Sequence, residues 1–408
     1  METNFLTNKQ GCDYNVFRRE IRSVRELNGL SRKELADKLN LSEQAIWQYE
    51  NQYTVPKFEV VNELKGVFNV KAQFFYSEPF ITNISKVESI AYRAEDREVR
   101  KKTKMETTFI NFVSYFLDKF ENRLNLPVST ITLLRNESIQ LYNLATDNNN
   151  KLLNLEIIAE KARKTLDIQT NADLLYKLEL SGIYVLEKNM GASIDAYSTW
   201  TNQEKPFIIL GNKKKSAVRR NFDLAHELGH LLLHYKIDMD SLTKDEHKKI
   251  EKEANDFAAF FLLPKEQFLK DFSIIKKKSN PESYLDLKMK YMVSIGSLEY
   301  RAYKLGLLTF EENRYFYATL NRKGYRKNEP LDEDIAIIRP GKVRSLLDLI
   351  FKNHVFPLKE ILDHYYIDRS FLESLFGLED KFLSQYVEET NREYFNNSNV
   401  VSLFSRGS

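Results

Sequence analysis

The sequence contains a single cysteine, Cys12, among its 408 residues. One thiol cannot form an internal disulfide, nor can it build a cysteine-ligated zinc ribbon or an iron–sulfur cluster. A metal ion bound by this chain must therefore be held by histidine and carboxylate side chains. Long apolar runs are absent as well, because the longest, Phe257–Leu263, is far shorter than the roughly 20 residues that span a bilayer. We therefore expect no membrane partner.

A strong charge of either sign is also missing, since the net charge is only +3 at pH 7. No global field draws the chain to nucleic acid, so any such binding must come from a local surface. The first fifteen residues lack the apolar core of a secretory signal, which predicts a cytoplasmic location. The hydrophobic share of 42% and the length of 408 residues indicate a folded chain of more than one domain.

The helical repeats and turn signals predict a mainly α protein with a small β-sheet, an α+β arrangement. A polar turn is expected at Asp147–Asn150, and a long amphipathic helix is expected around Phe109–Phe120. The sheet is predicted from three segments rich in β-branched and aromatic residues, 182–189, 194–200 and 206–211. The predicted domains are a five-helix unit at 14–76, a helical connector at 77–150, a mixed unit at 151–275, a helical extension at 276–390 and a poorly ordered tail at 391–408.

The N-terminal unit has the spacing of a helix-turn-helix. Ser31 and Glu34 form a capping box at the start of one helix, and Ser42 caps the next, so a short segment joins two crossing helices. On the second of these helices, Ile46 and Tyr49 are expected to face inward. Ser42 and the outward side chains near the N-terminal half of this helix are predicted to contact DNA in a major groove. These outward side chains are Glu43, Gln44, Trp47, Gln48 and Asn51, with Gln44 and Gln48 as the best base readers.

The segment GLSRKELADKLNLSEQAIWQYENQYTVPKFEVVNELKGVFNV resembles the lambda-repressor-like (XRE) helix-turn-helix family in its Gly-Leu-Ser, Glu-Leu-Ala, Ile-x-x-Tyr-Glu and Pro landmarks. The resemblance implies double-stranded DNA as a partner, with Arg32 on phosphate or base and with Glu43, Gln44 and Gln48 facing the groove. The acidic Glu43 departs from the usual neutral or basic residue.

The charge balance of residues 14–76 bears on how this unit would bind DNA. The segment holds ten Lys and Arg against eight Asp and Glu, so the attraction to phosphate is modest. We therefore expect a homodimer on a two-fold, operator-like site. The alternative is a helical domain that mediates protein contacts only.

Two histidines, His226 and His230, stand one helical turn apart in the pentapeptide His-Glu-Leu-Gly-His. At this i, i+4 spacing both imidazoles can reach one cation, while Glu227 lies beside the metal without binding it. Zinc in a catalytic site takes three protein ligands and keeps one position for water. The sequence therefore predicts a Zn²⁺ site that needs one more protein ligand.

The third ligand is predicted on the downstream helix EKEANDFAAFFLLP. Glu251 and Asn255 share an inward stripe of this helix, whereas Glu253 points about 200° away around its axis. We therefore expect Glu251 to complete the zinc site and Asn255 to hydrogen-bond a ligating histidine. His234, one turn beyond the histidine pair, would close the site as a fourth ligand, so a packing or polar role is favoured for it.

The stretch from Leu155 to Pro264 resembles the ImmA/IrrE family of metallopeptidases in RRNFDLAHELGHLLLH and EKEANDFAAFFLLP. The resemblance implies a gluzincin-like zinc endopeptidase in which Glu227 accepts a proton from the attacking water and passes it to the leaving amine. It further implies a repressor-like regulatory protein as substrate, or a toxin as partner, in a mobile-element, toxin–antitoxin or stress-response switch. The strand at 206–211 is expected to be the sheet edge on which an extended substrate docks. The alternative is a non-catalytic transcription regulator or antitoxin whose zinc domain is a sensor or docking scaffold.

Overall fold

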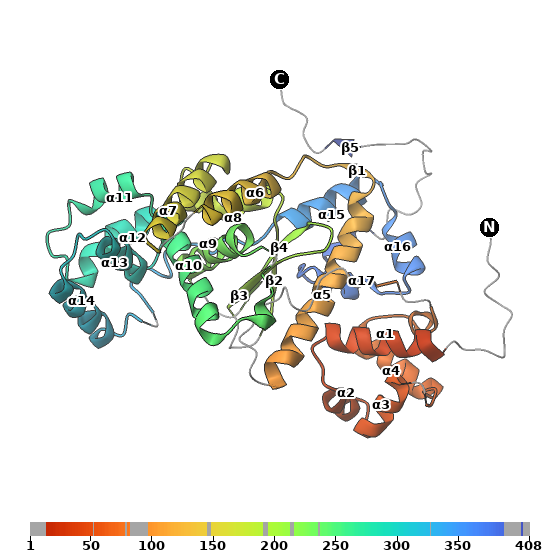
Figure 1. Cartoon of the computed structure of the whole chain (residues 1–408). Helices are drawn as coiled ribbons and strands as arrows, with labels where there is room; N and C mark the ends of the chain where they lie inside the picture. Colours follow the sequence, from red (N-terminus) through yellow and green to blue (C-terminus); the bar gives the residue numbers. More distant parts are fainter. Residues whose placement is uncertain are drawn as a thin grey trace. The chain divides into compact units, whose positions relative to one another are not determined.

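Figure 1 shows the computed structural model of the chain, which is mainly α-helical with a small β-sheet, as the sequence predicts. No described helix combines the length and the apolar character that crossing a bilayer requires. The tail predicted at 391–408 lies outside the described residues, except for a two-residue strand. The structure describes residues 14–51, 53–77, 80–81, 97–144, 148–190, 195–212, 216–235, 237–326, 328–386 and 401–402.

The chain divides into two compact units, and the first of them is made from both ends of the chain. Met1–Leu126 and Arg344–Ser408 form unit 1, whereas Pro127–Val343 form unit 2. These limits do not coincide with the predicted boundaries at residues 76, 150, 275 and 390. Unit 2 is thus inserted into the chain of unit 1, an arrangement that depends on long-range contacts and leaves no local signal in the sequence.

Unit 1 starts with the helices that the sequence predicts over residues 14–76, and the fifth of these, η1, is a 3₁₀-helix. The predicted capping box of α2 is present, because the Ser31 hydroxyl accepts from the Glu34 backbone and the Glu34 carboxylate accepts from the Ser31 backbone. Strands β1 and β5 pair in parallel. The elements of unit 1 are α1 (Tyr14–Leu27), α2 (Arg32–Lys38), α3 (Glu43–Glu50), α4 (Phe58–Phe68), η1 (Ala72–Tyr76), α5 (Arg97–Glu121), β1 (Leu124–Asn125), most of α15 (Lys342–Lys352), α16 (Leu358–His364), α17 (Arg369–Leu375), η6 (Phe382–Tyr386) and β5 (Val401–Ser402).

Aromatic packing joins the two chain ends within unit 1. The ring of Phe371 on α17 lies 6.0 Å from that of Phe112 and 6.4 Å from that of Phe116, both on α5. Val70 and Ile367 form a β-bridge, which ties the end of the helix-turn-helix segment to the C-terminal helices. The predicted amphipathic helix is confirmed as part of α5, whose buried face carries Phe109, Phe112, Phe116 and Phe120.

Unit 2 contains the sheet and the helices around it. The predicted turn at Asp147–Asn150 is wrong from Asn148 onward, because Asn148 is the first residue of α7. The elements of unit 2 are α6 (Thr130–Asn143), α7 (Asn148–Thr165), η3 (Asn171–Asp173), α8 (Leu174–Leu180), β2 (Tyr184–Lys188), β3 (Ala196–Trp200), β4 (Pro206–Gly211), α9 (Ala217–Leu233), η4 (Met239–Ser241), α10 (Lys244–Leu262), α11 (Lys265–Phe272), η5 (Pro281–Tyr284), α12 (Leu285–Tyr291), α13 (Ile295–Lys304) and α14 (Phe310–Arg322).

The three-stranded sheet has the order β2-β4-β3, with β2 parallel and β3 antiparallel to β4. All three predicted strands are confirmed, but the prediction that 206–211 is the edge is wrong. Strand β4 lies in the middle and all of its residues are buried. Its unbroken apolar run is typical of a strand that is covered on both sides. The edge beside the metal helix α9 is instead formed by β3.

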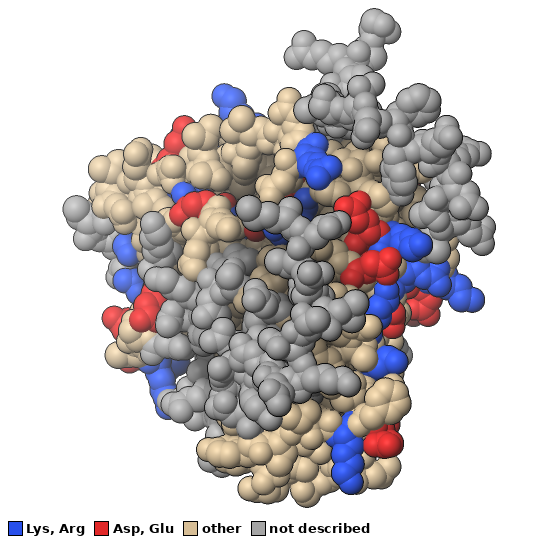
Figure 2. Space-filling model, turned by 90° about the vertical axis from the view of Figure 1, so that its right-hand side faces the viewer, with Lys and Arg blue, Asp and Glu red and all other residues tan. Residues whose placement is uncertain are grey.

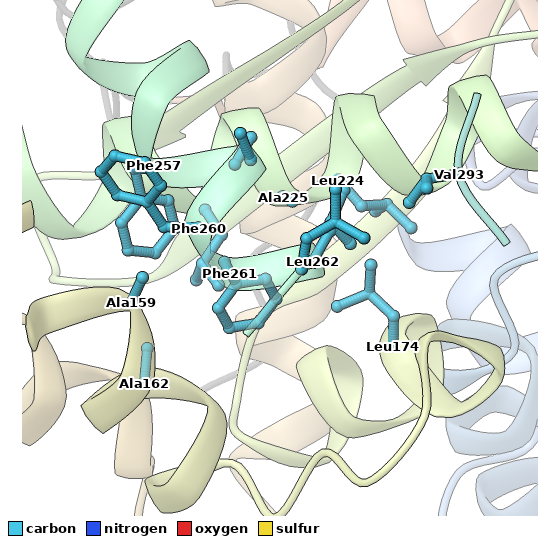
Figure 3. Packing of buried hydrophobic residues seen from close by; sticks show 14 of the residues in the cluster. Ala159, Ala162, Leu174, Leu224, Ala225, Phe257, Phe260, Phe261, Leu262 and Val293 are labelled. Atoms are coloured by element: carbon cyan, nitrogen blue, oxygen red, sulfur yellow. The ribbon is translucent and has the colours of Figure 1, made fainter. Parts of the chain in front are cut away.

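The core of unit 2 packs α10 against α7 and α9. Figure 3 shows Phe257 and Phe261 of α10 in this core, with Ala159 of α7 and Leu224 of α9 nearby. Gly229 of α9 lies against Phe257 and Ala254 of α10. A Cβ atom there would lie 3.0 Å from the Phe257 ring, so a larger residue at this position would push the Phe257 side chain away from α9.

A buried carboxyl group, Glu299 on α13, gives unit 2 a pH-dependent stability. Burial raises the pKa of Glu299 to about 7, and the Tyr317 hydroxyl offsets only part of this effect. Because the folded state holds the proton more tightly than the unfolded state, stability is lost as the pH rises from about 4.5 through 7. We expect Glu299→Gln to stabilise unit 2 by roughly 2–3 kcal/mol at pH 8 and by little at pH 4. Urea unfolding at both pH values measures the difference, and an equal effect at the two would contradict it.

Candidate metal centre and DNA-reading helix

Two helices bring the predicted metal ligands together. His226 and His230 lie one turn apart on α9, and Glu251 projects toward them from α10. The Nε2 atoms of the histidines are 3.0 Å apart, and the Glu251 carboxylate oxygens lie 3.6 Å from His226 Nε2 and 3.5 Å from His230 Nε2. Among the described residues, these three form the one group of His, Cys and carboxylate side chains with metal-ligand spacing.

The donor atoms suit a zinc ion in spacing and in charge. Tetrahedral ligands at bond lengths of about 2.0–2.1 Å lie roughly 3.3 Å from one another, close to the separations found here. Burial lowers the pKa of His226 to about 4, with a further contribution from His230. Burial also lowers the pKa of His230. Both imidazoles are therefore neutral near pH 7, the form that binds a metal.

Each ligating histidine has a polar neighbour behind it. The Asn255 amide oxygen lies 3.0 Å from His226 Nδ1, which is where the sequence predicts an orienting group. The Nδ1 atom of His234 lies 2.9 Å from His230 Nδ1. His234 is thus engaged with the far side of a ligand and does not face the donor atoms, in agreement with the polar role favoured for it.

Glu227 is buried next to the metal ligands and is held by a residue that the sequence analysis missed. The hydroxyl of Ser198 on β3 donates to Glu227 Oε2 at 2.7 Å. The indole of Trp200, also on β3, donates to the Leu231 carbonyl at 3.0 Å. Ser198 and Trp200, two positions apart on β3, therefore both attach this strand to α9. The one sequence signal for Ser198 is a polar side chain at every second position of a predicted strand.

Two further polar residues near the centre were not foreseen. Glu253 points away from the ligand cluster, as predicted, but it is buried, and its Oε2 atom lies 3.3 Å from His234 Nε2. The hydroxyl of Tyr142 on α6 donates to the same carboxylate oxygen at 2.6 Å. Tyr142 comes from a distant part of the chain, so no motif signals its presence.

Helix α3 presents the predicted DNA-reading side chains. Ser42 is its N-cap, because the Ser42 hydroxyl accepts from the Ala45 backbone. Ile46 is buried, as predicted, whereas Tyr49 is only half-buried and Glu50 takes the second inward position. The side chains of the outward face are Glu43 and Gln44, which are exposed, Trp47, which is 37% exposed, and Gln48, which is half-buried.

Two of the predicted DNA contacts are engaged within the domain. Asn51 is the C-cap of α3, not near its N-terminal half as predicted, and its amide accepts from Arg22 and donates to the Trp47 carbonyl. Arg32 donates to the buried Glu50 at 2.6 Å. Arg22, Arg25 and Arg32 all pair with the Glu50 carboxylate, so its buried negative charge is compensated. The helical spacing alone did not predict this cluster.

On the face shown in Figure 2, the described charged side chains do not form a large patch of one sign. Among the described residues on that face, Lys and Arg side chains lie next to Asp and Glu side chains. This agrees with the near balance of charges in the sequence.

Two segments of the chain match known protein families. Residues 178–303 match the Peptidase M78 family, described as the IrrE N-terminal-like domain. Residues 21–75 match a helix-turn-helix family. A search of the curated proteins found no match. The two family matches confirm the predicted fusion of an XRE-type helix-turn-helix with an ImmA/IrrE-like domain.

Proposed function

We propose that this chain, which joins an XRE-type helix-turn-helix to an ImmA/IrrE-like peptidase domain, is a DNA-binding regulator that cleaves a repressor-like protein. The observation that carries the proposal is the convergence of His226, His230 and Glu251 beside Glu227. Two neutral imidazoles and one carboxylate form the ligand set of a catalytic zinc site, which also keeps a position for water.

The chain's own residues can perform the steps of peptide hydrolysis. Zinc bound by the three ligands would polarise the scissile carbonyl and lower the pKa of its water toward about 7. Glu227, oriented by the Ser198 hydroxyl, accepts the proton of the attacking water. The same carboxyl group then delivers that proton to the leaving amine. Asn255 holds the His226 ring in position while this happens.

Strand β3 is the edge on which we expect an extended substrate to dock. Asp195 and Thr201 form backbone hydrogen bonds with the β4 side of the sheet. Because such bonds alternate along an antiparallel pair, the backbone groups of Ala196, Ser198 and Trp200 face the opposite side. Among the described residues β3 pairs with β4 alone, so this side can accept a substrate strand beside Glu227.

The test is co-expression of the chain with repressor-like proteins encoded by neighbouring genes, followed by intact-mass spectrometry of each candidate. We expect one of them to be cut at a single peptide bond, and we expect a zinc chelator to stop the reaction in the purified mixture. The proposal would be contradicted if the zinc-loaded chain regulated the neighbouring promoter but cut none of the candidate proteins. The chain would then be a non-catalytic regulator.

The DNA-binding part of the proposal places Gln44 and Gln48 on base edges, with the chain acting as a homodimer on a two-fold site. Gln44 lies in the capped first turn of α3, and Gln48 lies one turn further along the same face. Alanine at either position is expected to cost roughly 1–3 kcal/mol at the operator and little on random DNA. Fluorescence anisotropy with the two DNAs measures this, and equal losses on both would show that neither residue reads sequence.

A further inference from the structure

The His230 ring uses both of its nitrogen atoms. Its Nε2 atom faces the ligand cluster, 3.0 Å from His226 Nε2, and its Nδ1 atom lies 2.9 Å from Nδ1 of His234. Two ring nitrogens at this distance share one proton, so one of them donates and the other accepts. The direction of this hydrogen bond decides whether the lone pair of His230 Nε2 is available to a metal.

The residues behind His234 settle that direction. Its Nε2 atom lies 3.3 Å from Glu253 Oε2, which also accepts the hydroxyl proton of Tyr142 at 2.6 Å. Lys151 adds a positive charge 3.8 Å from the other oxygen. Glu253 is therefore an acceptor, and His234 carries its proton on Nε2.

A proton on His234 Nε2 leaves its Nδ1 as the acceptor, so His230 must donate from Nδ1. The lone pair of His230 Nε2 then points at the ligand cluster. We infer that His234 and Glu253 are positioning residues that fix the tautomer and the ring orientation of His230 for zinc. This inference rests on the proposed function, because it concerns the same metal site.

His234 does not serve as a fourth ligand in this arrangement. Its side chain is completely buried, and its ring nitrogens already have the partners His230 Nδ1 and Glu253 Oε2. The coordination position that water needs therefore stays open. The other histidine of the pair, His226, has the neutral amide of Asn255 at its Nδ1 atom, whereas the chain of contacts that ends in the Glu253 carboxylate reaches His230.

The experiment measures zinc affinity of the full chain by chelator competition, together with the absorption spectrum of the Co²⁺-loaded protein. Outer partners of metal-binding histidines typically contribute about 10–100-fold in affinity, and we expect a loss of that size for His234→Leu. In His234→Asn the amide oxygen takes the place of Nδ1 and still accepts from His230, so binding should stay within about threefold of wild type. The matched control is His247→Leu, because His247 bonds the Met239 carbonyl and does not touch the cluster.

The Co²⁺ spectrum separates positioning from ligation. Both His234 variants should keep the band positions of wild type, because the ligand set is unchanged. Loss of these bands in His234→Asn would make His234 a ligand and overturn the inference. Unchanged zinc affinity in His234→Leu would also overturn it, while leaving the proposed function intact. Absence of zinc binding in the wild-type chain would instead contradict the proposed function.

A measurement on the wild-type chain decides the matter even where His234→Leu fails to fold. The chain has six histidines, so ¹⁵N labelling of the imidazoles gives a tractable spectrum. We expect His230 to carry its proton on Nδ1 and His234 to carry its proton on Nε2. A proton on Nδ1 of His234 would reverse the hydrogen bond and overturn the inference.

Discussion

Glu227→Gln is expected to slow cleavage of the protein partner by about 10²–10⁴-fold, the usual contribution of a general acid–base group. Glutamine has nearly the same volume, and its amide oxygen can still accept the hydrogen bond from Ser198. It cannot accept the proton of the attacking water, so only the chemical step should suffer. Partner cleavage is followed by intact-mass spectrometry, with zinc content and operator binding measured on the same preparation.

The matched control for this prediction is Ser198→Ala. It leaves the Glu227 carboxylate in place and removes only the hydroxyl that orients it, so we expect a smaller loss than for Glu227→Gln. Zinc content and operator affinity should equal those of wild type in both variants. If Glu227→Gln cut the partner at the wild-type rate, Glu227 would not be the proton acceptor. If it regulated a reporter as well as wild type while no partner was ever cut, the chain would be a non-catalytic regulator.

The parts of the site that the sequence predicts are those that a single helix dictates. The i, i+4 spacing of His226 and His230 requires one face of α9, and a hydrogen-bonded turn leaves no other arrangement. The choice of Glu251 over Glu253 follows in the same way from the angle between positions on α10. The capping box of Ser31 and Glu34 and the three strands were also predictable, because each depends on neighbours a few residues apart.

The parts that the sequence leaves open depend on contacts between distant segments. Ser198 reaches Glu227 only because β3 is the edge strand, and strand order is set by the pairing of whole strands. Tyr142 reaches Glu253 from another helix, α6, so this contact depends on how helices far apart in the sequence pack together. The buried Glu50 could not be foreseen either, since its burial depends on arginines from α1 and α2.

The insertion of unit 2 into unit 1 is the largest feature of this kind. The described residues of the segment 340–390 are mostly helical, as predicted, and the sequence assigns them no role. Their packing against α5 makes most of them part of the same unit as the helix-turn-helix. Aromatic residues spaced along α5 indicated a buried face, but nothing local indicated that helices from the other end of the chain would cover it.

Glu251→Gln is expected to weaken zinc binding by more than about 100-fold, beyond the range that residues outside the ligand set contribute. The carboxylate is the one negative charge among the three donors, and its oxygens lie 3.5 and 3.6 Å from the two histidine Nε2 atoms. A neutral amide supplies a weaker ligand and leaves the charge of the ion less balanced. Zinc content by elemental analysis and affinity by chelator competition measure the loss.

The matched control is Glu253→Gln, two positions along the same helix. Glu253 contacts His234 and Tyr142 and does not reach the ligand cluster, so its substitution should reduce zinc affinity less than that of Glu251. The two variants carry the same chemical change on α10, which separates ligation from a general loss of negative charge near the site. Full zinc occupancy in Glu251→Gln together with loss of zinc in Glu253→Gln would exchange the roles of the two carboxylates. It would also require α10 to turn by more than half a revolution about its axis, which the close packing of Gly229 against Phe257 resists.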